Sequence, residues 1–185
     1  MKDNRIVTKF FKVFVFLMIS TLFSCSENQA RRPKKQGTTN FYKEVIAKNK
    51  KLNALEKKRL EKWISKDTLT KYEVSQSGFW YTYLVKDSIN NPVKNPKPTP
   101  ENTVVFSFDI SDINGNIIYQ KEERSYKIDK EDFIPALQDG IKLMKKGEIV
   151  TFVIPSYRAF GVVGDGNKIT VNQPIKSTVA LLEIK

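Results

Sequence analysis

The apolar positions of residues 133–154 first follow a helical spacing and then form a nearly continuous run. Three of them recur at steps of four and three residues, which places them on one face of a helix: Leu137, Ile141 and Met144. Pro135 suits the first turn of a helix, where its missing N–H would have no partner, and Gly147 suits the end of the segment. Residues 148–154 then predict a strand. The pattern indicates a short helix that leads into a sheet, as a core element or as part of a binding site.

Strand-like segments flank this helix on both sides. They are short, rich in β-branched and aromatic residues, and separated by turn-forming residues. The predicted strands are residues 72–75, 79–86, 103–111, 116–120, 124–128, 148–154 and 174–184. The pair Asn114-Gly115 is the strongest hairpin signal, and four prolines in residues 87–102 predict an extended loop. Six or seven strands around one helix, without an internal repeat, predict an α+β fold with an antiparallel sheet.

A lysine-rich amphipathic helix is predicted ahead of this domain, from Asn40 as its N-cap to about Lys66. Its apolar positions are Phe41, Val45, Leu52, Leu55, Leu60, Trp63 and Ile64. Two interpretations stay open. Such a helix can lie on an anionic membrane surface, or it can be a solvated spacer that docks its Trp63 end on the following domain.

The composition excludes several kinds of chemistry. Histidine is absent and there is one cysteine, so a His-based acid or base, a Ser-His triad, a His-ligated metal, an intramolecular disulfide and a Cys-based zinc site are all ruled out. The net charge is +12, but residues 31–66 hold 13 Lys/Arg against three Asp/Glu, and residues 67–185 hold 15 of each. The globular part is therefore neutral overall and carries no signature of nucleic-acid binding. We expect no cofactor.

Residues 1–24 have the three parts of a targeting signal, with basic residues first and then an apolar run too short to span a membrane. The run ends directly before Cys25, and this junction resembles the lipobox of bacterial lipoproteins, in which the cysteine is lipidated. We therefore predict lipidation at Cys25; the alternative is an ordinary secretory signal followed by an unrelated cysteine. Residues 25–39 are polar and predict a flexible tether, 40–66 the basic helix, and 67–185 the globular domain.

Several short motifs resemble the FKBP-type peptidyl-prolyl isomerases. They are Asn114-Gly115, Phe133-Ile134-Pro135, Gly140, Leu143-Met144, Gly147, Ile154-Pro155, Ala159-Phe160-Gly161, Gly164 and Ile169, and their order and spacing match the family from Thr103 to the end of the chain. The resemblance implies a twisted antiparallel sheet wrapped around one short helix. Together with the lipobox, the lysine-rich helix and Ser77-Gly78-Phe79-Trp80-Tyr81, it is further similar to the lipoproteins of this family associated with gliding motility in Bacteroidota.

The resemblance also implies a set of site residues. Those expected to form the catalytic pocket are Phe108, Phe133, Ile134, Leu137, Phe160 and Ile169, and those expected to contact the substrate around it are Ile118, Tyr119, Tyr126, Asp165 and Ser177. The backbone N–H of Ile134 would hold a substrate carbonyl. At Phe108 and Phe160 the family usually has a tyrosine, so two hydroxyl groups are missing, and Leu137 is smaller than the usual tryptophan at the pocket floor.

These expectations define two functions. The first is a membrane-anchored isomerase or folding factor that acts on proline-containing segments of exported proteins, without nucleic acid as a partner. The second is a non-catalytic module that holds such segments in an envelope complex. Rotation of an X-Pro amide needs neither histidine nor metal, which agrees with the composition. We expect the protein in the cell envelope, on the outer membrane and facing the periplasm.

Overall fold

The computed structural model describes residues 12, 38–87 and 95–185 of the chain. The fold discussed here is that of Glu44–Lys185, which forms one compact unit. The helices are α2 (Thr38–Ile64), α3 (Pro135–Ile141) and the short 3-10 helix η2 (Ser156–Arg158). The strands are β1 (Glu73–Val74), β2 (Trp80–Val85), β3 (Thr103–Ser111), β4 (Ile117–Lys127), β5 (Ile149–Ile154) and β6 (Ile175–Ile184).

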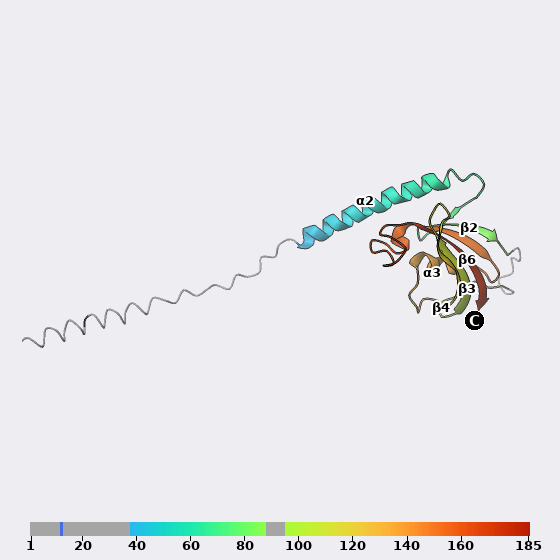
Figure 1. Ribbon diagram of the computed structural model, residues 1–185. Helices are drawn as coiled ribbons and strands as arrows, with labels where there is room; N and C mark the ends of the chain where they lie inside the picture. The colour runs from blue at the N-terminus through green and yellow to red at the C-terminus, as the bar shows by residue number, and fades with distance from the viewer. Residues whose placement is uncertain (1–11, 13–37, 88–94) are drawn as a thin grey trace, which may run out of the picture. The chain divides into compact units, whose positions relative to one another are not determined.

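The six strands form one sheet in the order β1-β2-β5-β6-β3-β4 (Figure 1). Every neighbouring pair is antiparallel. The central strand β5 is buried along nearly its whole length because it has a strand on each side and packed residues on both faces, whereas β4 lies at an edge and is mostly exposed. The predicted α+β architecture with an antiparallel sheet and one short helix is confirmed.

Helix α3 lies against one face of the sheet, and its buried residues are Ala136, Leu137, Gly140 and Ile141. Phe79, which directly precedes β2, and side chains of the strands complete this core, among them Phe106, Phe152, Val179 and Leu181. The helix approaches β5 closely, since an added Cβ at Gly140 would lie 2.6 Å from a ring carbon of Phe152. The burial of both Leu137 and Ile141 agrees with the helical spacing in the sequence.

Two predicted strands, residues 116–120 and 124–128, are wrong as separate elements because β4 is continuous from Ile117 to Lys127. The polar run at residues 121–123 suggested a break. In the structure Glu122 and Glu123 lie opposite Phe108 and Ser107 of β3, and the register shifts between Glu122 and Tyr119 without ending the strand. A strand at the edge of a sheet can carry charged residues without interrupting its backbone hydrogen bonds.

The predicted start of the leading helix is also wrong. Helix α2 begins at Thr38, so Asn40 lies inside it and does not cap it. Among the described residues, no helix is both long enough and apolar enough to cross a membrane.

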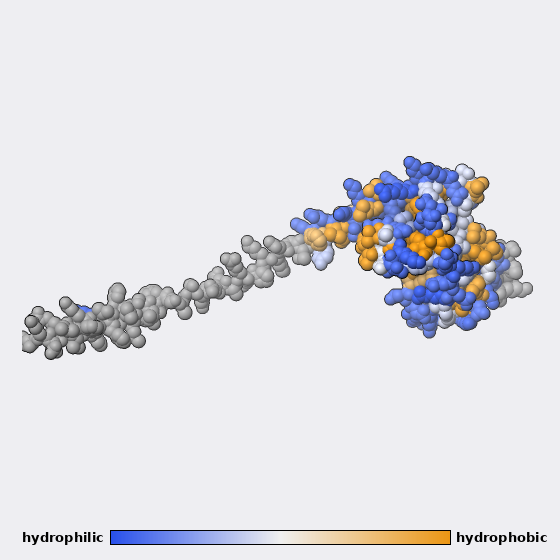
Figure 2. All heavy atoms as spheres, viewed as in Figure 1, coloured by the Kyte–Doolittle hydropathy of each residue, from blue (hydrophilic) through white to orange (hydrophobic). Residues whose placement is uncertain are grey.

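The C-terminal end of α2 packs on the face of the sheet opposite α3. Leu60 is 1% exposed and forms a cluster with Trp80 of β2 and Val153 of β5, and Trp63 and Ile64 pack against that cluster. In the view of Figure 2, hydrophilic residues cover most of the upper edge of α2 and hydrophobic residues lie below them. This packing is the one expected for a spacer that docks its Trp63 end.

Candidate functional site

A pocket of about 610 Å³ opens between the β3–β4 ribbon, the start of α3 and the loop that follows η2. It is lined by Phe108, Ile110, Tyr119, Glu122, Arg124, Asp132, Phe133, Ile134, Pro135, Ala159, Phe160, Asp165 and Asn167. Three separate parts of the chain therefore build one concave site, with aromatic side chains in its wall. Such a mixture of apolar wall and a few polar groups is typical of ligand sites.

Phe133 is the centre of the aromatic wall. Its ring lies 5.3 Å from that of Phe108 in an edge-on arrangement, 5.5 Å from Phe106 and 6.0 Å from Tyr126, between ring centroids. The guanidinium carbon of Arg124 lies 4.5 Å from the centroid of the Phe133 ring. Contacts with several aromatic rings and a cation hold the Phe133 side chain in one orientation at the pocket.

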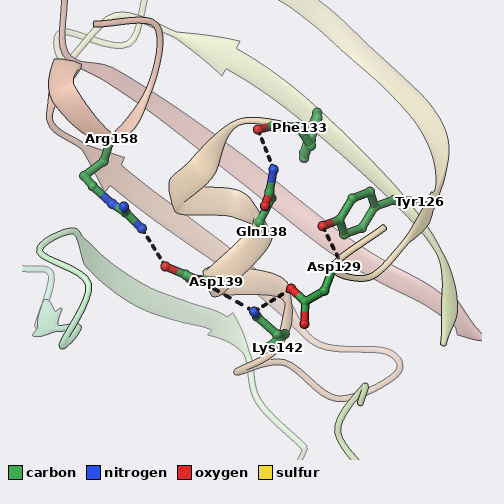
Figure 3. Close-up of polar contacts among 7 residues, drawn as sticks. All are labelled: Tyr126, Asp129, Phe133, Gln138, Asp139, Lys142 and Arg158. Carbon is green, nitrogen blue, oxygen red and sulfur yellow. Dashed lines mark hydrogen bonds and ion pairs between the residues drawn. The ribbon is translucent and has the colours of Figure 1, made fainter. Parts of the chain in front are cut away.

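The backbone at the start of α3 presents a donor to this pocket. The Ile134 carbonyl accepts hydrogen bonds from the N–H groups of Leu137 at 2.8 Å and Gln138 at 3.0 Å, which fixes the first turn of the helix. The Gln138 Nε2 donates to the Phe133 carbonyl at 2.8 Å, as Figure 3 shows. Within the described part of the chain, the Ile134 N–H has no acceptor. It is therefore free to bind a carbonyl oxygen of a ligand.

Tyr119 and Asp165 face each other across the opening. The Tyr119 hydroxyl donates a hydrogen bond to Asp165 Oδ2, and this bond raises the pKa of Tyr119 and lowers the pKa of Asp165. The other oxygen, Oδ1, accepts from the N–H groups of Asn167 at 2.9 Å and Ile169 at 2.8 Å. Asp165 thus keeps its negative charge and orders the loop that forms this side of the pocket.

A chain of ion pairs beside α3 links the helix to the segments around it (Figure 3). Asp139 of α3 pairs with Arg158 of η2 at 2.5 Å and with Lys142 at 3.6 Å. Lys142 also pairs with Asp129 at 2.9 Å, and the Asp129 N–H donates to the Tyr126 hydroxyl at 3.3 Å. The helix, η2 and the end of β4 are therefore held at fixed positions around the pocket.

Six of the residues expected from the sequence line this pocket. They are Phe108, Phe133, Ile134 and Phe160 from the expected catalytic set and Tyr119 and Asp165 from the expected substrate contacts. They come from β3, β4, the start of α3 and the loop after η2, so the fold brings together residues that are far apart in the sequence.

The other five expected residues do not line it. Leu137 is fully buried in the core between α3 and the sheet, and Tyr126 is buried behind the Phe133 ring. Ile118 packs against the edge of the core, and the buried Ile169 closes the loop that holds Asp165. Ser177 is buried on β6, where its hydroxyl donates to the Asp109 carbonyl at 2.7 Å.

Seven lining residues were not expected from the sequence: Ile110, Glu122, Arg124, Asp132, Pro135, Ala159 and Asn167. Two of them could have been predicted, because Glu122 and Arg124 are four and two residues from Tyr126 and so share its face of a continuous strand. This shared face was missed because residues 121–123 were interpreted as a break between two strands. Lysine, arginine and glutamate on an edge strand otherwise resemble an ordinary solvated surface.

The charged groups at the opening are mostly acidic. Three carboxylates line the pocket, those of Glu122, Asp132 and Asp165, against one cation, Arg124. Among the described residues, the structure contains no ion pair of these carboxylates with a basic side chain. The same part of the chain has no group of three His, Cys, Asp or Glu side chains suited to hold a metal ion. The site is therefore an apolar pocket with an acidic rim.

Comparisons with solved structures find a similar fold in a peptidyl-prolyl isomerase and in two further proteins. A peptidyl-prolyl cis-trans isomerase from Pseudomonas syringae pv. tomato is 19% identical with a TM-score of 0.57, covering 71% of this chain and 95% of that one. FkpA from Escherichia coli is 23% identical with a TM-score of 0.57, covering 94% of this chain and 82% of that one. The three FKBP domains of wheat FKBP73 are 20% identical with a TM-score of 0.53, covering 63% of this chain and 49% of that one.

The amino-acid sequence was also compared with curated proteins and with models of protein families. No curated protein sequence matches the chain. Residues 94–182, however, match the profile of the FKBP-type peptidyl-prolyl cis-trans isomerases. That region contains β3 to β5, α3, η2 and most of β6, and with them every residue that lines the pocket. The region that carries this aromatic pocket therefore matches the FKBP-type peptidyl-prolyl cis-trans isomerase family, and its fold is similar to that of a solved peptidyl-prolyl isomerase.

Proposed function

We propose that this chain catalyses the cis–trans isomerisation of X-Pro bonds in exported proteins. The observation that carries the proposal is the aromatic pocket with the unpaired Ile134 N–H at its rim. Proline is apolar and fits a wall of aromatic rings, and an extended substrate offers a carbonyl to the N–H beside it. Neither step requires a covalent intermediate or a titrating group.

The chemistry is rotation about an amide bond. The uncatalysed barrier is about 18–20 kcal/mol because rotation breaks the conjugation of the amide. The planar amide has a larger charge separation than the twisted one, so an apolar wall formed by Phe108, Phe133 and Phe160 favours the twisted form relative to water. Binding of the flanking chain at Ile134 fixes one side of the bond while the other turns.

A second function is favoured by the polar groups that the pocket lacks. Phe108 and Phe160 have no hydroxyl to donate, and the Tyr119 hydroxyl is already bonded to Asp165. Each missing hydrogen bond to the substrate costs about 1 kcal/mol, which is several-fold in rate. On this alternative the pocket holds proline-containing segments of an envelope complex without catalysing their isomerisation.

A protease-coupled assay with X-Pro peptides separates the two functions. We expect the purified full chain to accelerate isomerisation, Phe133→Ala to lower kcat/KM by about tenfold or more, and Leu69→Ala, whose side chain is 97% exposed and far in sequence from the pocket, to leave it unchanged. A rate equal to background, together with measurable binding of the same peptides, would reject the enzyme in favour of the binding module.

The cellular setting is part of the proposal. We infer a lipid anchor at Cys25 and a site of action in the cell envelope, on the outer membrane facing the periplasm, in support of gliding-motility or secretion machinery. The support is the lipobox-like junction at the end of the apolar run; this segment lies outside the described residues. Incorporation of labelled palmitate that is lost in Cys25→Ser, with loss of membrane association, tests the anchor. Uptake of no label by the natural chain would contradict it.

A further inference from the structure

Glu56 of α2 makes a two-point contact with Ser156, which lies 100 residues further along the chain. Its Oε1 accepts the Ser156 backbone N–H at 2.6 Å, and its Oε2 accepts the Ser156 hydroxyl at 2.6 Å. Ser156 is 1% exposed, and Glu56 lies one helical turn before Leu60, which is buried against the sheet. Both carboxylate oxygens are thus used in short charge-assisted hydrogen bonds at a packed contact.

The Ser156 end of this contact leads directly to the pocket. Ser156 begins η2, which receives no side-chain hydrogen bond from its own N-cap residue, Pro155. The Ser156 carbonyl accepts the N–H groups of Ala159 at 2.9 Å and Gly161 at 2.8 Å. These bonds enclose Ala159 and Phe160, the two residues of this turn that line the pocket. The position of Ser156 therefore sets the position of that wall.

The opposite side of η2 is fixed by α3. Arg158 pairs with Asp139 at 2.5 Å, and the Arg158 Nε is buried and has no hydrogen-bond partner among the described residues (Figure 3). The pairing on that side thus uses one end of the guanidinium and leaves its Nε without support. Glu56 supplies the other restraint, and it comes from a helix outside the region 94–182 that matches the isomerase family.

We propose that Glu56 is a positioning residue of the isomerase site: from the leading helix, and through Ser156, it fixes the pocket wall that carries Ala159 and Phe160. The inference rests on the proposed function, and it makes α2 a part of the functional unit in addition to a spacer. The physical reason is that η2 is a single turn with few bonds of its own, so its position depends on the groups that restrain it from outside.

The test compares Glu56→Gln with Glu61→Gln in the full chain. Glutamine has the size of glutamate but lacks its charge and one of its two acceptor oxygens. At a temperature where Glu56→Gln is fully folded, we expect its kcat/KM to be about five- to tenfold lower and its Kd for an X-Pro peptide to be higher. Glu61 is exposed and pairs only loosely with Lys57 at 3.9 Å, so its variant should behave as the natural chain. A lower Tm with unchanged kcat/KM and Kd would reduce Glu56 to a structural role and overturn the proposal.

Amide hydrogen exchange provides a readout that does not need catalysis. The N–H groups of Ala159 and Gly161 should exchange faster in Glu56→Gln, because the carbonyl that they donate to is no longer held. Ser156→Ala removes only the hydroxyl bond and should give a smaller change in the same direction, and it serves if Glu56→Gln does not fold. If the natural chain lacks isomerase activity, the proposed function is wrong. The role of Glu56 as a positioning residue is then still tested by peptide binding and by amide hydrogen exchange. Unchanged exchange and unchanged peptide binding in both variants would overturn it.

Discussion

Replacing Gly140 with alanine would place a methyl group where the side chain of Phe152 already lies. The new Cβ would be 2.6, 2.9 and 3.2 Å from three carbons of the Phe152 ring. Both residues are buried, and the ring is held in the core between α3 and β5, so it has little room to move away. Either the ring leaves its preferred rotamer or α3 moves outward.

Overpacking of this kind costs about 1–3 kcal/mol, whereas replacing a helical glycine with alanine gains up to about 1 kcal/mol in helix propensity. We therefore expect Gly140→Ala to lower the free energy of unfolding by about 1–2 kcal/mol and Tm by about 3–8 °C. Since α3 begins at the pocket rim, an outward shift also displaces the Ile134 N–H. The value of kcat/KM should then fall several-fold even where the protein remains folded.

Denaturant unfolding and the peptide assay check this reasoning, with Gly115→Ala as the control. Gly115 has a φ of 94° and no atom within 4 Å of an added Cβ, so alanine there strains the backbone without a clash. In a Phe152→Leu background the cost of Gly140→Ala should shrink, because the contacting ring carbons are gone, while the cost of Gly115→Ala should not change. A Gly140→Ala protein as stable as the natural one would refute the proposed close packing.

Three further outcomes concern the pocket. Phe160→Tyr restores a hydroxyl at the wall and should raise kcat/KM about fivefold; a rate at or below that of the natural chain would contradict a role for the missing donor. Because Glu122, Asp132 and Asp165 line the pocket, X-Pro peptides with lysine before proline should react faster than those with glutamate at that position. Added salt should reduce this difference in rate, and equal rates at low salt would exclude the preference. The Tyr119 hydroxyl is the main cause that lowers the pKa of Asp165 from its usual value of 3.8. The charged carboxylate therefore stabilises the fold fully above pH 3.8, and this stabilisation is lost as the pH falls through the lower pKa of the folded state. An NMR titration should find a higher Asp165 pKa in Tyr119→Phe, and an unchanged pKa would contradict the hydrogen bond.

Local sequence patterns were sufficient where a segment's neighbours along the chain decide its structure. The alternation of apolar residues at 103–111 predicted β3 with the bounds that the structure has. The spacing of Leu137 and Ile141 predicted α3 and its buried face, and Asn114-Gly115 predicted the turn, where Gly115 has a φ of 94°. The strand β4 was missed as one element because an edge strand with exposed charges has no apolar alternation to follow.

Only the tertiary structure shows which residues line the pocket. Leu137 and Ile134 stand three residues apart, yet Leu137 points into the core and Ile134 lies at the pocket rim. Ser177 was expected at the pocket and instead bonds to the Asp109 carbonyl across the β3–β6 pair. Glu122 and Arg124 reach the pocket because β4 continues past the register shift opposite Phe108 and Ile110. Such differences depend on the direction of each side chain relative to other elements, which residue type does not specify.

Periodicity and turn residues predicted the fold class and the short helix between its strands, because these patterns act over a few residues. The resemblance to FKBP-type isomerases indicated the aromatic and apolar residues of a proline pocket. The tertiary structure decided the strand order, which of these residues face the pocket, and the contact of Glu56 with Ser156 across 100 residues. These outcomes depend on which surfaces are buried together when the whole domain folds. Local sequence patterns do not determine which surfaces these are.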